Sequence, residues 1–134
     1  MIAVDTNVLV RLLTGDDREQ AAAARGLFAT QQIWIAKTVL LETGWALGSL
    51  YGFEESAIRE AFTKLLGLRN VQVEDEPSVA AALALTTHGI ELADAMHLSS
   101  RPRGAAFLSF DPSFVRRAKR AGAAEVSGIP SKKR

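Results

Sequence analysis

The chain has 134 residues, of which 48% are hydrophobic and 23% are charged, and its formal net charge is +1. This length and composition are typical of one compact globular domain with a full hydrophobic core. The absence of cysteine excludes disulfide scaffolds, thiolate zinc sites and cysteine nucleophiles. The longest apolar run is too short to span a membrane, and Met1 leads directly into an apolar segment with no room for a signal peptide. We therefore expect a cytoplasmic protein without membrane contact.

The charge is distributed unevenly along the chain. Residues 112–134 carry seven Lys or Arg against one acidic residue, a net charge of +6, whereas residues 1–111 have a net charge of −5. A basic end beside an acidic body is typical of a nucleic-acid binder with a metal site, and it is equally typical of a solubilising chain end. We expect one domain over residues 1–128, followed by a basic C-terminal tail over residues 129–134 that ends in Lys132-Lys133-Arg134.

Apolar segments of two kinds alternate along the chain. Short apolar runs bounded by polar residues predict strands over residues 2–4, 33–36, 71–73, 105–109 and 124–126. Apolar residues at helical spacing predict helices over residues 8–13, 17–31, 38–51, 54–66, 77–87, 91–100 and 112–121. Asp16 or Asp17 is expected to cap the second helix and Thr38 the third. Strands that alternate with helices indicate an α/β fold, a three-layer α/β/α sandwich around a mostly parallel sheet.

Four acidic residues stand in apolar surroundings at the ends of these elements. Asp5 and Asp111 each follow a predicted strand, while Glu42 and Asp94 lie near the starts of two predicted helices. Each has a structural explanation as a helix cap or a first-turn acid. The carboxyl ends of parallel strands face one edge of a sheet, however, and open sheets bind ligands there. Four carboxylates that converge on this edge would repel one another unless a cation were bound, and oxygen ligands favour Mg²⁺ or Mn²⁺ over zinc.

The order of these residues is similar to that of a known family. The segments are Val4-Asp5-Thr6-Asn7-Val8-Leu9, then Glu42, then Ala93-Asp94-Ala95-Met96-His97-Leu98, and finally Ser109-Phe110-Asp111. Together they resemble the PIN domain and, within it, the VapC-type toxins of bacterial and archaeal toxin–antitoxin pairs. The resemblance covers nearly the whole chain. It implies a metal-dependent ribonuclease with a five-stranded parallel sheet between helices.

The resemblance also implies roles for individual residues. The catalytic, metal-binding residues would be Asp5, Glu42, Asp94 and Asp111, with Thr6, Asn7 and Ser109 as polar neighbours. Ser109 stands where threonine is often found, which keeps the hydroxyl group. RNA would be the substrate and Mg²⁺ or Mn²⁺ the cofactor. The protein partners would be a cognate antitoxin and a second copy of the chain.

Divalent ions activate water and stabilise charge on phosphate oxygens during phosphodiester hydrolysis. We expect Asp5 and Asp94 to bind the principal ion, and Glu42 and Asp111 to complete the site, hold a second ion or orient the attacking water. Three other residues receive weaker assignments. Thr6 is expected to act as a helix cap rather than a catalyst. Trp34 and Trp45 are expected in the core or at an interface before they serve as base-stacking surfaces.

Several alternative functions follow from the same acidic residues. A phosphatase of the haloacid dehalogenase type needs a second aspartate two residues after the first, where this chain has Asn7. A receiver domain needs paired acids after the first strand and a phospho-accepting aspartate near mid-chain, and neither is present. Two alternatives stay open. One is a PIN nuclease that processes RNA without an antitoxin, and the other is a module that binds a metal or basic peptide without catalysis.

Overall fold

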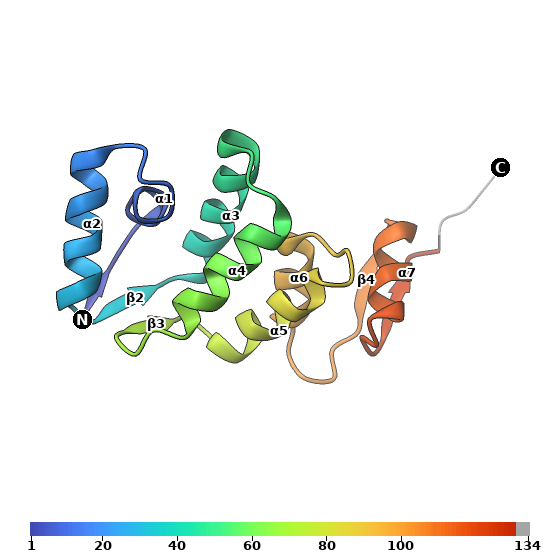
Figure 1. Cartoon of the computed structure of the whole chain (residues 1–134). Helices are drawn as coiled ribbons and strands as arrows, with labels where there is room; N and C mark the ends of the chain where they lie inside the picture. The colour runs from blue at the N-terminus through green and yellow to red at the C-terminus, as the bar shows by residue number, and fades with distance from the viewer. Residues whose placement is uncertain (131–134) are drawn as a thin grey trace. The chain divides into compact units, whose positions relative to one another are not determined.

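The computed structural model describes residues 1–130, which form seven helices and five strands (Figure 1). The end of the predicted basic tail, Lys132-Lys133-Arg134, lies outside the described residues. The chain divides into two compact units, Met1–Ala80 and the residues from Ala81 onward. The boundary falls within one helix, α5 (Glu76–Thr86). Within the described part of the chain, no helix is both long enough and apolar enough to cross a membrane.

The first unit is built on three parallel strands. They are hydrogen-bonded in the order β1 (Ile2–Ala3), β2 (Ile33–Ile35) and β3 (Val71–Val73). The connecting helices are α1 (Thr6–Thr14), α2 (Arg18–Thr30), α3 (Lys37–Tyr51) and α4 (Glu55–Leu66). Helix α1 contacts α2 and α3, α3 contacts α4, and α4 contacts β3. The buried residues of β2 and β3 are Ile33, Ile35, Val71 and Val73, apolar as expected for strands covered by helices.

The second unit is built on two parallel strands, β4 (Phe107–Ser109) and β5 (Val126–Gly128). Its helices after α5 are α6 (Leu92–Ser99) and α7 (Pro112–Arg120), and α7 contacts both strands. The rings of Phe107 on β4 and Phe114 on α7 lie 5.4 Å apart between centroids, a separation typical of packed aromatic pairs. This contact holds the start of α7 against the strand that precedes it.

The predicted α/β class with parallel strands is confirmed. All strand pairs of the described residues are parallel, and hydrogen bonds join the strands as one three-stranded and one two-stranded sheet. The strand over residues 71–73 was predicted without error, whereas the last strand starts at Val126, two residues later than expected. Asp17, one of the two residues expected to cap α2, does so by accepting a hydrogen bond from the backbone N of Gln20 at 3.0 Å.

The prediction that Thr38 caps the third helix was wrong. Thr38 lies inside α3, and the N-cap position is Ala36, whose side chain offers no oxygen. The backbone N of Lys37 instead donates to Glu74 Oε1 at 2.9 Å. Glu74 directly follows β3, so a side chain from the neighbouring strand connection satisfies an amide at the start of α3. Such a long-range cap leaves no local signal in the sequence.

Candidate active site

Asp5 stands at the junction between β1 and α1. It lies two residues after Ala3, the end of β1, and is the N-cap of α1, where its Oδ1 accepts a hydrogen bond from the backbone N of Val8 at 3.2 Å. The side chain is exposed. Within residues 1–130, Oδ2 of Asp5 has no hydrogen-bond partner. The cap therefore occupies one carboxylate oxygen and leaves the other for a ligand.

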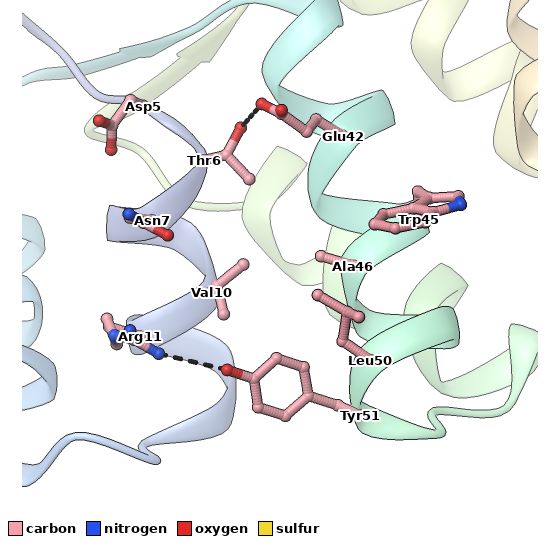
Figure 2. Close-up of a pocket in the computed structure, with 10 residues that line it drawn as sticks. All are labelled: Asp5, Thr6, Asn7, Val10, Arg11, Glu42, Trp45, Ala46, Leu50 and Tyr51. Carbon is pink, nitrogen blue, oxygen red and sulfur yellow. Dashed lines mark hydrogen bonds between the residues drawn. The ribbon is translucent and has the colours of Figure 1, made fainter.

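Glu42 reaches the same region from the second turn of α3. Its Oε1 accepts a hydrogen bond from the hydroxyl of Thr6, the first residue of α1 (Figure 2). This bond connects the beginning of α1 to α3 and holds the Glu42 carboxylate at the first turn of α1. Thr6 does not cap α1, because Asp5 does, so the cap expected for Thr6 was wrong. The residue has a different task, which is to hold an acid from another helix.

Asp5, Thr6, Asn7 and Glu42 line a pocket between α1 and α3 with a volume of about 510 Å³ (Figure 2). The remaining lining residues are Val10, Arg11, Trp45, Ala46, Leu50 and Tyr51. The carboxylates thus occupy one end of the pocket, and a basic and an aromatic residue occupy the other. Ligand pockets typically enclose roughly 300–1,000 Å³, so this one is large enough for part of a nucleotide chain.

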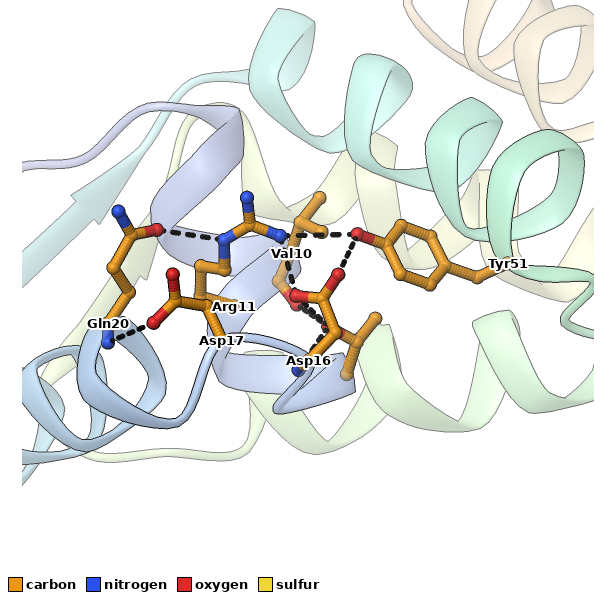
Figure 3. Close-up of polar contacts among 7 residues, drawn as sticks. Val10, Arg11, Asp16, Asp17, Gln20 and Tyr51 are labelled. Atoms are coloured by element: carbon orange, nitrogen blue, oxygen red, sulfur yellow. Dashed lines mark hydrogen bonds and ion pairs between the residues drawn. The ribbon is translucent and has the colours of Figure 1, made fainter.

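The far end of the pocket is closed by a charged network around Arg11 (Figure 3). Arg11 Nη1 donates to Asp16 Oδ1 at 2.6 Å and to the Tyr51 hydroxyl at 3.2 Å, and that hydroxyl donates to Asp16 Oδ2 at 2.7 Å. Arg11 Nε donates to Gln20 Oε1 at 2.8 Å. The network joins α1, the turn before α2, and the end of α3. It therefore fixes the two helices that carry Asp5 and Glu42.

The hydrogen bond from Tyr51, with further contributions from Arg11, lowers the pKa of Asp16 below its usual value. A carboxylate with a lowered pKa in the folded state stabilises the protein above its ordinary pKa, and this stabilisation is lost as the pH falls through the folded-state value. We expect the unfolding free energy of Asp16→Asn to fall less steeply than that of the wild type below about pH 4. Denaturant unfolding at a series of pH values measures the slopes, and Tyr51→Phe should reproduce part of the change. Parallel wild-type and Asp16→Asn curves would contradict this role of Asp16.

The second unit repeats the arrangement found at Asp5. Asp111 lies two residues after Ser109, the end of β4, and is the N-cap of α7. Its Oδ1 accepts hydrogen bonds from the backbone N of Ser113 at 3.0 Å and from that of Phe114 at 3.3 Å. The hydroxyl of Ser109 accepts from the backbone N of Asp111 at 3.0 Å. Asp94 is the third residue of α6 and is half-buried. Each unit therefore contributes two of the four predicted carboxylates.

The donor set at the Asp5 pocket fits a hard divalent cation. Neither unit, within residues 1–130, by itself brings together three acidic or imidazole side chains that could enclose an ion. Mg²⁺ does not need such a cage, because it is usually held by one or two carboxylates together with waters and substrate phosphates. Asp5 and Glu42 supply two carboxylates in one accessible pocket. The pocket offers no sulfur ligand and no histidine, so zinc fits it less well.

Residues 2–120 match the family described as the PIN domain. The chain belongs to the PIN-domain family. PIN domains are typically metal-dependent nucleases, and PIN nucleases act on RNA. The matched residues of this PIN domain include all four candidate carboxylates, from Asp5 to Asp111. No curated protein matches the chain.

Sequence reasoning missed two features of this PIN domain. Trp45 was expected in the core or at an interface; it is exposed and therefore not in the core, and it lines the same pocket as Glu42. The network of Arg11 and Tyr51 joins residues 40 positions apart, and neither residue carries a signal for such a pairing. Trp34, in contrast, is half-buried in β2. Because Trp45 is followed by apolar residues, the sequence carried no sign that its side chain is exposed. The exposure follows from the orientation of α3 in the fold.

Proposed function

We propose that this PIN domain is a Mg²⁺- or Mn²⁺-dependent endoribonuclease. The metal site would consist of Asp5, Glu42, Asp94 and Asp111. The main support is that Asp5 and Glu42 line one accessible pocket, where the Thr6 hydroxyl holds Glu42, in a chain that belongs to a family of nucleases. Asp94 and Asp111 belong to the second unit, so the proposal requires both units to act as the single domain expected over residues 1–128.

The residues would divide the work of phosphodiester hydrolysis among them. A bound divalent ion supplies an activated water and stabilises charge on the phosphoryl oxygens. Asp5 and Asp94 would hold the principal ion, and Glu42 and Asp111 would complete its surroundings or orient the attacking water. Thr6 fixes the direction of the Glu42 carboxylate. Asn7, in the same pocket, offers an amide donor to a phosphate oxygen, and Ser109 steadies the backbone of Asp111.

We further propose a role for the nuclease as the toxin of a VapBC-like toxin–antitoxin pair in the cytoplasm. The order and spacing of the four acidic segments support it. A cognate antitoxin would then bind the chain, and the toxin would form homodimers. The alternative is an RNA-processing nuclease without an antitoxin. Expression of the chain alone should slow growth, and Asp94→Asn should relieve the effect. Equal toxicity of the two proteins would count against RNA cleavage as the cause.

Cleavage of RNA by the purified chain tests the proposed activity. We expect a single-stranded RNA to be cut when Mg²⁺ or Mn²⁺ is added and to stay intact in EDTA. Cleavage that continues in EDTA would contradict the metal site. Complete inactivity with both ions, together with measurable Mn²⁺ binding, would favour the binding module without catalysis.

Thr6 offers a test of how the Glu42 carboxylate is positioned. Thr6→Val keeps the shape of the side chain but removes the hydroxyl that donates to Glu42. A hydrogen bond to a charged group is worth about 1.5–3 kcal/mol, so we expect kcat for RNA cleavage to fall roughly tenfold or more. Thr6→Ser keeps the hydroxyl and should stay close to the wild type. Equal rates for the valine and serine variants would show that the hydrogen bond does not position Glu42.

A further inference from the structure

Trp45 carries an exposed indole on a helix whose neighbouring positions are buried. Trp45 is 63% exposed, whereas Thr43, Gly44, Ala46 and Leu47 are all buried. A packed tryptophan removes a large apolar area from water. An indole left in solvent at this position therefore forms an apolar surface that a ligand can cover.

The position of the ring relates it directly to the candidate metal site. Trp45 lies three residues after Glu42 on α3, and residues at this spacing share a helix face with β-carbons about 5–6 Å apart. Both residues line the pocket that also contains Asp5 (Figure 2). Trp45 therefore borders the same pocket as the two carboxylates, on its α3 side.

We propose that Trp45 stacks against an unpaired base of the RNA, next to the phosphate that is cut. This inference rests on the proposed nuclease function and adds to it a contact with one base of the substrate. Proteins recognise single-stranded RNA by stacking its bases on aromatic side chains, and each such contact is worth about 1–3 kcal/mol. An RNA strand with a phosphate at Asp5 and Glu42 would bring its bases into the pocket that Trp45 also lines.

A second copy of the chain is a less suitable permanent occupant of this surface. The pocket that contains the ring also contains both carboxylates. A second copy of the chain seated permanently over Trp45 would cover Asp5 and Glu42 as well and close the site to RNA. A base covers the ring only while the substrate is bound, so it agrees with both the exposure of the indole and the activity.

Fluorescence quenching tests the stacking contact on the full chain. The chain has two tryptophans, and Trp45→Phe removes the emission of one while the half-buried Trp34 remains. A short single-stranded RNA is titrated with Ca²⁺ in place of Mg²⁺, and a gel checks that the strand is intact. We expect quenching of the wild type but not of Trp45→Phe, and none with an abasic ribose-phosphate strand of equal length. Equal quenching by the abasic strand would overturn the proposal.

Affinity and kinetics provide the second measurement. Trp45→Ala should weaken RNA binding about tenfold to a hundredfold and raise KM, with an unchanged melting temperature because the ring is exposed. The control Leu68→Ala removes another exposed apolar side chain, 43% exposed and outside the pocket, and should bind RNA like the wild type.

Unchanged binding and KM for Trp45→Ala would overturn the stacking contact, whereas cleavage by the wild type would still support the nuclease. A wild-type dimer that Trp45→Ala converts to a monomer would assign the ring to a second copy and also overturn it. Quenching without any cleavage would retain the contact and reject the nuclease.

Discussion

Asp5→Asn is expected to lower kcat for metal-dependent RNA cleavage at least about a hundredfold. Loss of groups that merely support metal ligands typically costs about 10–100-fold, so loss of a ligand charge should cost more. The substitution separates the two tasks of this residue, because Asn and Asp cap helices about equally well. The cap on the backbone N of Val8 should therefore survive, and the melting temperature should stay close to that of the wild type.

The chain provides a matched control for this substitution. Asp17 is also a helix N-cap, and its Oδ1 accepts a hydrogen bond from a backbone N three residues later, as Asp5 does. It does not line the Asp5 pocket. Asp17→Asn should therefore cleave RNA at the wild-type rate. A similar loss of activity in both variants would indicate damage to the helices rather than loss of a metal ligand.

Leu9→Ala is expected to have the largest effect on stability among the substitutions considered. Leu9 lies on α1 and is 0% exposed. Replacing a buried leucine by alanine typically costs about 2–5 kcal/mol, a large part of the total stability of about 5–15 kcal/mol of a typical domain. Denaturant unfolding measures the change. Because α1 carries Asp5 and Thr6, activity should also be lost at a lower temperature than in the wild type.

Leu68→Ala is the control for this loss of stability. It removes the same atoms from a position that is 43% exposed, where substitutions usually change stability by less than about 0.5 kcal/mol. A Leu9→Ala variant as stable as Leu68→Ala would show that α1 is not held by its buried face. Some other contact would then have to hold α1 beside α3 and so maintain the pocket between them.

The sequence predicted the elements well because their signals are local. Apolar periodicity located Ile33–Ile35 and Val71–Val73, and the helix predicted over residues 54–66 ends at Leu66 as expected. The four carboxylates were selected by their apolar neighbours and by their places at element ends. Asp5 and Asp111 indeed follow strands at the same spacing and cap the next helix in the same way.

What the sequence could not provide were contacts between distant segments. The Thr6 hydroxyl meets Glu42 across 36 positions, and Glu74 caps a helix that begins 37 positions earlier. Such pairings depend on how α1, α3 and β3 pack, and single residues do not encode them. The exposure of Trp45 has the same origin. The apolar neighbours of Trp45 predicted the core or an interface, and only the packing of α3 shows that the residue lines an open pocket.

Mn²⁺ binding tests the joint metal site more directly than activity does. Titration calorimetry on the wild type, Asp5→Asn and Asp94→Asn compares one carboxylate from each unit with the intact chain. If carboxylates of both units hold the same ion, each substitution should weaken Mn²⁺ binding at least about tenfold, and the double variant should lose little more than either single one. Wild-type affinity in Asp94→Asn, with binding lost in Asp5→Asn, would contradict a site shared by the two units.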